Sequence, residues 1–415
     1  MRGDKKVIWL VNYYAMPPKL ESRLRTIKFA KYLQLEGYEV TVVSSSIMHN
    51  MNLNLIEDGR SYINREYDGI NFFQINSLKY NNNGIKRYLS LFQFHLKLFF
   101  LKEKLQKPDI ILHVALPPFG NIVNVLARRI RAKYIVEILD LWPESFVELG
   151  LIKRNNPFLT LLYQFERWLY ESADEVVFSM EGGADYIESK KWDTRNGGKI
   201  DIRKKVHYIN NGIDLSDFDF SRKSYFLDDE DLNNKEIKKV IYLGSIRKAN
   251  NVIELLQAAS TLKDEKDIVF LIYGDGDQRD NLIKYCESNG LENVKFKEKW
   301  IDPKFVPFVV SRADVNVLNY MSGSFGNYGG SQSKLFQYMA AGKPICCNLK
   351  MLYCQITKNK LGIATEFKSP SEYGEAINNL VKLTNKEKEE INQRAISAVQ
   401  EFDYQNLTEK LIRIF

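Results

Sequence analysis

Four turns in the second half of the chain carry polar or basic side chains, and three of them also contain glycine, a composition typical of phosphate-binding sites. Each follows an apolar run that resembles a buried strand, and they span residues 244–251, 274–277, 297–301 and 329–334. A glycine-rich turn that enters a helix presents unpaired N–H groups and the positive end of the helix dipole to an anion. One such turn is weak evidence, because many surface turns look the same. Four of them in one half of the chain indicate a site for an anionic ligand.

The first of these turns supplies two cations that are well placed to meet a phosphate. Gly244 permits close approach of the backbone, and Arg247 and Lys248 follow it. The last turn adds Lys334 near the start of an expected helix. For Lys248, the alternative of a solvated loop lysine stays open.

The elements that must position these turns alternate between strand and helix patterns. Apolar runs without alternation, typical of strands in a parallel sheet, occur at 6–11, 38–44, 109–114, 133–139, 175–179, 238–244, 267–273, 293–296 and 313–318. Helical patterns separate them, as at 22–35, 120–131 and 277–288. This order predicts the α/β class, with two Rossmann-like, doubly wound domains that face each other across a cleft.

The alternation is interrupted once, which divides the chain. Residues 1–212 are expected to form the first domain and residues 237–385 the second. The polar stretch 213–236, with the acidic run 228–231, is interpreted as a linker. Residues 386–415 are expected to form closing helices that pack back toward the first domain.

Composition excludes several classes of protein. The chain has 415 residues, more than one ordinary core needs, and 45% hydrophobic with 27% charged residues is typical of a soluble globular protein. The apolar run at 7–11 is too short for a signal peptide and is interpreted as the first strand, and no uncharged stretch reaches the length of a membrane span. The four cysteines lack C-x-x-C spacing and are expected to be reduced thiols of a cytoplasmic protein.

The basic charge of the chain is concentrated in one window. Residues 80–133 contain ten Lys or Arg and two acidic residues, so this window alone exceeds the net charge of +7. Within it, residues 85–102 form a helix-length segment rich in Leu and Phe. It is interpreted either as a core helix with a basic outer face or as a helix that contacts an anionic membrane surface. Nucleic acid is not an expected partner, because no nucleic-acid-binding motif accompanies the charge.

Residues 333–345, with the sequence Ser-Lys-Leu-Phe-Gln-Tyr-Met-Ala-Ala-Gly-Lys-Pro-Ile, resemble the donor-site helix of retaining glycosyltransferases of the GT-B fold, family four. The subgroup that they resemble builds bacterial O-antigen and capsule. The resemblance continues at 11–14, 17–18, 25, 29–33, 140–145, 181–186, 211–214 and 273–276. Its most specific part is Asp-Leu-Trp-Pro-Glu-Ser at 140–145.

The resemblance implies a nucleotide diphosphate sugar on the second domain and an acceptor on the first, with transfer that retains anomeric configuration. It implies no metal and no cofactor beyond this co-substrate. The residues expected to act in catalysis are Asp140, Lys248 and Arg247. Those expected to bind the donor are Gly244, Ser245, Gly274, Lys299, Trp300, Ser331, Ser333, Lys334, Leu335 and Gln337. Those expected to contact the acceptor or the sugar are Arg25, His113, Trp142 and Glu144.

Other interpretations of several of these residues stay open. Asp140 is also suited to capping the following turn, and His113 to packing in a core. Both Trp142 and Trp300 are suited to burial as well as to stacking on a sugar or base.

Two donor-site positions depart from the pattern that the chain resembles. Many relatives carry two Glu residues eight positions apart, and here those positions are Gly329 and Gln337. Gln can hydrogen-bond a ribose hydroxyl through its amide, without the strength of a carboxylate. Gly329 offers only its backbone.

The function expected from the sequence is transfer of a sugar from a nucleotide diphosphate donor to a lipid-linked saccharide in capsule or O-antigen biosynthesis. The donor is expected to be UDP-linked and to carry an N-acetylated hexosamine. The place of action is expected to be the cytoplasmic face of the cell membrane. Two alternatives are a degenerate GT-B protein that binds without catalysis and a sugar-nucleotide epimerase. A dinucleotide dehydrogenase is disfavoured, because no Gly-x-Gly-x-x-Gly follows the first strand.

Overall fold

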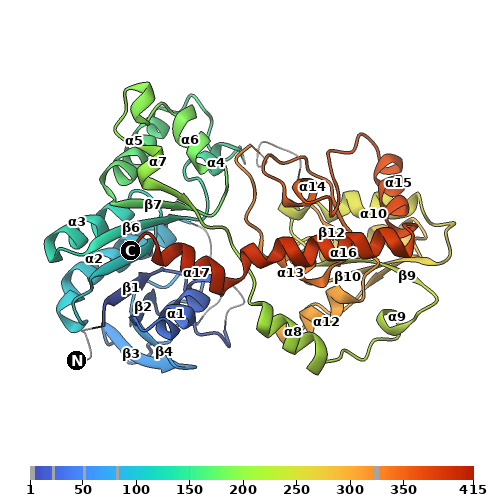
Figure 1. Ribbon diagram of the computed structural model, residues 1–415, viewed down its shortest axis with the longest axis horizontal. Helices are drawn as coiled ribbons and strands as arrows, with labels where there is room; N and C mark the ends of the chain where they lie inside the picture. The colour runs from blue at the N-terminus through green and yellow to red at the C-terminus, as the bar shows by residue number, and fades with distance from the viewer. Residues whose placement is uncertain (1–4, 21–23, 50–52, 81–83, 149, 322–326) are drawn as a thin grey trace. The chain divides into compact units, whose positions relative to one another are not determined.

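The computed structural model describes residues 5–20, 24–49, 53–80, 84–148, 150–321 and 327–415. The chain folds into two α/β units (Figure 1). Unit 1 comprises Met1–Asn210 together with Leu407–Phe415, and unit 2 comprises Asn211–Asn406. Part of the expected helical segment 22–35 lies outside the described residues.

Unit 1 is built on one sheet in the order β3-β4-β2-β1-β5-β6-β7-β8. All neighbouring strands are parallel except β3, which pairs antiparallel with β4. The strands are β1 Val7–Val11, β2 Glu39–Ser45, β3 Tyr62–Tyr67, β4 Ile70–Ile75, β5 Ile110–Val114, β6 Lys133–Ile138, β7 Glu175–Phe178 and β8 Val206–Tyr208. Every residue of β1 is buried, as expected for a strand with both faces covered by helices.

The helices of unit 1 cover both faces of this sheet. They are α1 Arg25–Leu35, α2 Ile85–Leu101, α3 Gly120–Ile130, α4 Glu144–Glu148, α5 Pro157–Ser172, α6 Gly183–Ser189 and α7 Ile202–Lys205. Because crossovers between parallel strands are right-handed, α2, α3 and α5 lie on one face and α1 on the other. In this layer α3 packs against both α2 and α5.

Unit 2 is built on a second, wholly parallel sheet in the order β11-β10-β9-β12-β13-β14. The strands are β9 Lys238–Leu243, β10 Ile268–Tyr273, β11 Val294–Phe296, β12 Val315–Leu318, β13 Ile345–Cys347 and β14 Gly362–Ala364. Numbered from β9, this is the 3-2-1-4-5-6 order of a Rossmann sheet. The direction in which successive strands are added reverses between β9 and β12.

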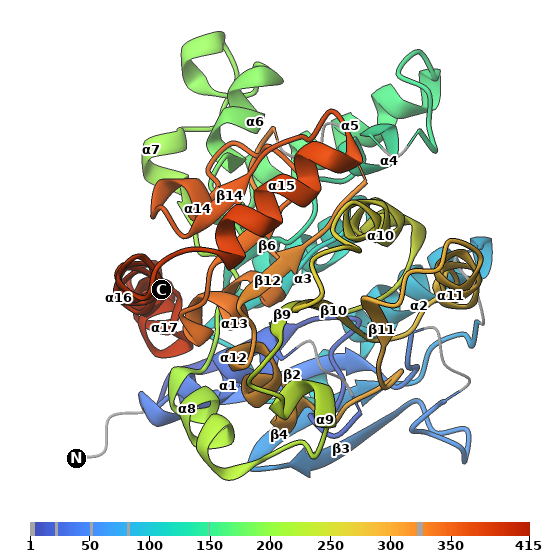
Figure 2. The ribbon, with the colours of Figure 1, turned by 90° about the vertical axis from the view of Figure 1, so that its right-hand side faces the viewer.

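The helices of unit 2 bury alternate faces of its strands (Figure 2). They are α8 Leu215–Ser224, α9 Glu230–Asn233, α10 Val252–Ser260, α11 Arg279–Ser288, α12 Val306–Ser311, α13 Ser333–Ala341, α14 Gln355–Lys358, α15 Pro370–Val381, α16 Asn385–Val399 and α17 Tyr404–Ile412, whose last residues belong to unit 1. Val240 and Tyr242 pack with α10, α11 and α15, whereas Ile241 packs with α9 and α12.

The stretch 213–236, expected to be a linker, is an ordered part of unit 2 that contains α8 and α9. Asp229 caps α9 and accepts hydrogen bonds from Lys297 Nζ at 2.8 Å and Tyr273 Oη at 3.0 Å. Phe218 and Leu232 are buried. The acidic run is therefore held by the carboxyl ends of β10 and β11, an interaction that local composition does not reveal.

The closing helices divide between the two units. Helix α16 packs against α13 of unit 2, and only Leu407–Phe415 groups with unit 1. There Lys133 Nζ donates to the carbonyl oxygen of Ile414 at 2.6 Å. Across the described ranges, every helix is too short or too polar to traverse a bilayer.

Candidate active site

The candidate site of unit 2 lies where its strand order reverses. Neighbouring strands β9 and β12 pair through Val240 and Val315, and the direction in which strands are added along the sheet reverses between them. In open parallel sheets, ligands bind at such a switch point. The turn that begins at Gly244 follows β9 directly, so the first phosphate-binding turn expected from the sequence occupies this position.

The turns after β9 and β10 lie so close together that only glycine fits. Gly274 has φ +124°, and a Cβ there would lie 2.0 Å from the carbonyl oxygen of Gly244. A Cβ on Gly244, where φ is +152°, would lie 2.5 Å from Lys334 Nζ. The N–H of Ile246 also donates to the carbonyl oxygen of Asp275 at 2.8 Å. The two turns and Lys334 therefore form one compact group.

Lys334 is a buried cation without a counter-ion in the part of the chain that the structure describes. Its Nζ is inaccessible to solvent and has no hydrogen-bond partner there, and it lies 4.8 Å from the ring centroid of Tyr242. Burial lowers the pKa of this ammonium to about 8. Desolvating an unpaired charge is unfavourable. An anion bound beside Gly244 would therefore stabilise the charged form of Lys334.

The same helix carries a second orphaned polar atom. Gln337 follows Lys334 by three residues on α13, and its Oε1 is buried without a partner among the described residues. Leu335 is buried between them. Ser333 begins the helix, whose first N–H groups have no intrahelical acceptor. Ser331 is fixed by Asn211, which donates to its carbonyl oxygen at 2.6 Å.

Two residues that sequence reasoning missed hold the turns in place. Asn319, fully buried at the end of β12, donates to the carbonyl oxygen of Asn250 at 3.2 Å and accepts from Tyr373 Oη at 2.7 Å. Arg279 donates to the carbonyl oxygens of Gly274 at 2.7 Å and Lys297 at 2.6 Å. The sequence could have indicated Asn319, because it directly follows an expected strand. No local sequence feature indicated a role for Arg279.

The remaining candidates for donor binding and catalysis in unit 2 are exposed to solvent. Arg247 and Lys248 are exposed on the turn after β9, and Ser245 Oγ donates to Asn250 Oδ1 at 2.9 Å. Lys299 is exposed and Trp300 is 73% exposed. Buried packing of Trp300 is therefore excluded, while any contact of this ring with a nucleotide stays a prediction.

In unit 1, Arg25 is fully engaged inside the protein. Its Nε and Nη2 donate to Glu137 Oε1 at 3.0 and 2.7 Å, and Nη2 also donates to the carbonyl oxygen of Ile209 at 2.8 Å. Arg25 is 6% exposed and Glu137 2% exposed. The pair joins α1 to β6 and to the chain beyond β8. Arg25, expected to contact the acceptor, therefore has a structural role here.

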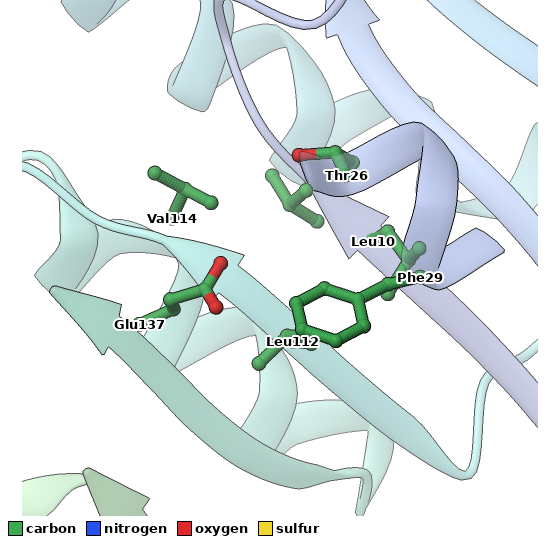
Figure 3. A pocket seen from close by; sticks show the side chains of 7 residues that line it. Leu10, Thr26, Phe29, Leu112, Val114 and Glu137 are labelled. Atoms are coloured by element: carbon green, nitrogen blue, oxygen red, sulfur yellow. The ribbon is translucent and has the colours of Figure 1, made fainter. Parts of the chain in front are cut away.

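A small, largely apolar cavity adjoins this ion pair where the strand order of unit 1 reverses, between β1 and β5 (Figure 3). It is lined by Leu10, Val11, Thr26, Phe29, Leu112, Val114 and Glu137. Figure 3 shows the Glu137 carboxylate at its wall. That carboxylate is already paired with Arg25, so the cavity offers no unpaired charge to an acceptor.

His113 is buried, contrary to its expected place at an acceptor. Its Nδ1 lies 2.9 Å from Tyr134 Oη and its Nε2 3.2 Å from His95 Nε2. Burial lowers the pKa of His113 well below the usual value, and that of His95 to about 4. Both rings are therefore neutral at neutral pH, and the core interpretation holds for His113.

Glu144 and Trp142 are also held within unit 1. Glu144 accepts from Lys190 Nζ at 2.6 Å, from Arg154 Nη2 at 3.0 Å and from Tyr163 Oη. Burial alone raises the pKa of this carboxyl, but hydrogen bonds from Lys190 and Tyr163 hold it below its usual value. Trp142 is 7% exposed. Both residues are enclosed in the loop after β6, and the sugar contact expected of them stays a prediction.

Asp140 is the member of this block that faces solvent. Its side chain is exposed, yet partial desolvation raises the pKa of the carboxyl above its usual value. It precedes the anchored residues Trp142 and Glu144 in the loop after β6. A carboxylate presented on a fixed loop is suited to contact a reacting sugar, and this role stays a prediction.

Comparison with known proteins identifies the family. Residues 24–196 match the family model described as glycosyl transferase 4-like domain, and residues 226–398 match the model described as glycosyl transferases group 1. The two matches fall in unit 1 and unit 2, respectively. The chain belongs to the GT-B glycosyltransferases of the family-four type.

Individual relatives are distant. The chain is 22% identical to the probable glycosyltransferase WbjE of Pseudomonas aeruginosa over 267 residues, 64% of this chain and 62% of that protein. It is 26% identical to TuaH of Bacillus subtilis, named as a teichuronic acid biosynthesis glycosyltransferase, over 45% of each protein. The chain thus matches less than two thirds of the length of both relatives.

A solved structure shares the fold. The crystal structure of a glycosyltransferase from Rickettsia africae superimposes with a TM-score of 0.69 at 16% identity, covering 99% of this chain and 98% of that one. The expected fold class, two Rossmann-like units of GT-B type, is confirmed.

Proposed function

We propose that this protein is a retaining glycosyltransferase that transfers a sugar from a nucleotide diphosphate donor to a lipid-linked saccharide in bacterial cell-surface polysaccharide biosynthesis. The observation that carries the proposal is the buried ammonium of Lys334 beside Gly244 at the switch point of unit 2, which has no partner in the described part of the chain. The family matches and the polysaccharide pathway in the name of TuaH support the same class of reaction.

The chemistry follows from where negative charge develops. When the bond between the anomeric carbon and the donor phosphate breaks, the leaving diphosphate gains charge, while the acceptor hydroxyl oxygen bonds to that carbon and loses its proton to the diphosphate. Lys334, the first N–H groups of α13 and the exposed cations Arg247 and Lys248 would stabilise that charge in advance. Because these groups supply the positive charge, the proposed reaction requires no divalent metal or other cofactor.

Asp140 and Gln337 have distinct roles in this proposal. Asp140 contacts the reacting sugar from unit 1, whereas the orphaned Oε1 of Gln337 accepts a hydrogen bond from a ribose hydroxyl of the nucleotide. Gln337 would do so more weakly than the Glu expected at its position, because the hydrogen bond lacks assistance from charge.

A donor panel tests the proposal. The protein is incubated with UDP-, GDP- and ADP-linked sugars, with and without a lipid-linked saccharide fraction and with EDTA, and release of nucleoside diphosphate is measured. We expect acceptor-dependent release from one nucleotide class, with UDP-N-acetylhexosamines first, undiminished by EDTA. Nucleotide binding without release would favour a degenerate GT-B protein, and conversion of the donor without acceptor would favour an epimerase. Either result would overturn the proposed transfer.

The proposed acceptor is at a membrane, and α2 has the surface to reach it. Five apolar side chains along α2 are exposed, from 38% to 77%, and they follow one another by three or four residues: Ile85, Leu89, Phe92, Leu96 and Phe100. The helix buries its opposite face through Leu91, Phe94 and Leu98. Basic residues flank the exposed row, including Lys86 and Lys102. We propose that α2 lies in the anionic surface of the cytoplasmic leaflet.

Flotation with vesicles checks this contact. Because each exposed Phe adds apolar area on insertion, Phe92→Ser/Phe100→Ser should weaken partition onto phosphatidylglycerol vesicles by about tenfold or more. The matched control, Phe220→Ser/Phe226→Ser, removes two side chains of unit 2 that are 61% and 64% exposed and should bind like the parent. Equal binding of the α2 variant and the parent would contradict the contact.

A further inference from the structure

Helix α5 of unit 1 carries a second row of exposed apolar side chains, separate from the row on α2. Phe158, Leu161 and Trp168 are 58%, 43% and 46% exposed, and Phe165 is partly exposed. Spacings of three, four and three residues place these four side chains along one side of the helix. The core contacts of α5 use a different face, which includes Leu159 and Leu162 among its buried residues. The row is therefore not part of the core of unit 1.

The side of α5 that carries this row is turned toward α3. Asn121 on α3 donates through Nδ2 to the carbonyl oxygen of Phe165 at 3.2 Å. About two turns further along α3, Arg128 Nη2 donates to the carbonyl oxygen of Ser172 at 3.0 Å. Since Phe165 and Ser172 lie on the same side of α5 as Phe158 and Leu161, the exposed row borders α3.

Helix α3 in turn connects α5 to α2. The guanidinium of Arg129 lies 4.9 Å from the ring centroid of Phe99 on α2. Between its two neighbours α3 exposes Val125, which is 37% accessible. The three helices occupy the same face of the sheet, so their outer surface is continuous, with apolar rows on α2 and α5 and α3 between them. For this chain we call it the three-helix face.

The charge of the three-helix face is positive. Its exposed basic residues, including those on the segment that leads into α5, are Lys86, Arg128, Arg129, Lys153 and Arg154, of which Arg154 is paired with Glu144. Of the acidic residues on these helices and the turn after α2, Glu103 is paired with Lys102 at 3.1 Å and Glu171 with Arg167 at 2.8 Å.

The opposite layer differs in its exposed apolar residues. Among the described residues of α1, the one large apolar side chain that is exposed is Leu35. Isolated apolar residues are normal on protein surfaces, whereas contiguous patches mark interaction sites. Trp and Phe beside Lys and Arg are the composition of a helix surface at the membrane interface.

We infer that α5 is a second membrane contact, and that the whole three-helix face, rather than α2 alone, rests on an anionic lipid surface. The occupant is the bilayer surface itself, because the face pairs apolar rows with an excess of positive charge. This inference rests on the membrane contact proposed for α2 and extends it to residues outside 85–102. Phe158, Leu161 and Trp168 enter the interfacial region while Arg128 and Arg129 meet lipid phosphates.

Trp168 makes the inference directly measurable. Of the five tryptophans, Trp9, Trp142 and Trp192 are buried, and Trp168 and Trp300 are exposed. In the full-length Trp300→Phe variant, Trp168 is therefore the exposed tryptophan whose fluorescence responds to lipid. The protein is mixed with vesicles of phosphatidylglycerol and phosphatidylcholine in equal parts, with acyl chains brominated or not. We expect the emission to shift to shorter wavelength and to be quenched only by brominated lipid.

Further measurements separate this inference from the proposal for α2. Phe158→Ser/Leu161→Ser should lower vesicle partition about tenfold or more without touching α2. If the protein floats with the vesicles but brominated lipid does not quench Trp168, the α5 contact is overturned and the proposed α2 contact is retained. Failure to bind any vesicle would overturn both membrane contacts, while the donor panel would still report on sugar transfer. Self-association through the three-helix face, seen by sedimentation in the absence of lipid and abolished by the α5 variant, would also overturn it.

Discussion

Replacing Lys334 by Met should lower nucleoside diphosphate release by about 100-fold or more, the scale on which a preorganised electrostatic group contributes to a transition state. It should do so without destabilising the unliganded protein. The Nζ of Lys334 has no partner among the described residues, and burial holds its pKa at about 8. Met keeps the apolar stem and removes a desolvated charge, so the melting temperature should stay level or rise.

Lys343 provides a matched control. It lies just beyond α13, and burial lowers the pKa of its ammonium too, but the charge of Asp314 opposes that shift. Lys343→Met should therefore retain near-parental release of nucleoside diphosphate. If Lys334→Met instead unfolds the protein while leaving the turnover of the folded fraction intact, Lys334 is a structural residue and not a diphosphate ligand.

The pH dependence of the Lys334 effect has a defined sign. The folded pKa of about 8 lies below the usual lysine pKa of 10.5, so the unfolded chain binds more protons between these values. The cost of the buried charge is fully present below pH 8, and stability increases as pH rises from about 8 toward 10.5. A diphosphate favours the charged form, so binding near pH 8–9 should take up protons. Calorimetry in buffers of different ionisation enthalpy measures this uptake, which Lys334→Met should abolish.

The grouping of the glycine turns with Lys334 in unit 2 could be predicted from sequence because its signals are local. Glycine at 244 and 274 and a lysine at the start of an apolar helix are visible as residue types at strand ends. The structure adds the reason for the glycines, which is contact between the two turns through their backbones. It also adds Asn319 and Arg279, whose partners are distant in sequence and therefore invisible to pattern reasoning.

The expectations that the structure does not support concern polar residues whose partners lie elsewhere in the chain. Arg25 meets Glu137, and His113 meets His95. Each pairing depends on which strands become neighbours, and residue type alone does not distinguish a buried ion pair from a substrate ligand. The interpretation of the acidic run 228–231 as part of a linker was wrong for the same reason, because its partner Lys297 follows it by more than sixty positions. Fold class was predictable because it rests on the alternation of whole elements.

Replacing Arg25 by Met should destabilise unit 1 by about 3 kcal/mol or more, the usual cost of removing one partner from a buried ion pair. The variant leaves Glu137, which is 2% exposed, and the carbonyl oxygen of Ile209 without their guanidinium partner. Urea unfolding at neutral pH measures the loss. Arg154→Met is the control, because Arg154 is 69% exposed in its pair with Glu144 and should cost about 1 kcal/mol or less.

A double variant separates the two roles considered for Arg25. Because the penalty in Arg25→Met comes from an uncompensated buried carboxylate, Arg25→Met/Glu137→Met should recover much of the lost stability. If the ion pair is purely structural, the folded double variant should also keep the parental KM for acceptor. A single variant that unfolds like the parent but shows a raised acceptor KM would restore Arg25 to the acceptor site. If the single variant loses stability, the double variant regains it and the acceptor KM does not change, Arg25 is a structural residue that joins α1, β6 and the chain beyond β8.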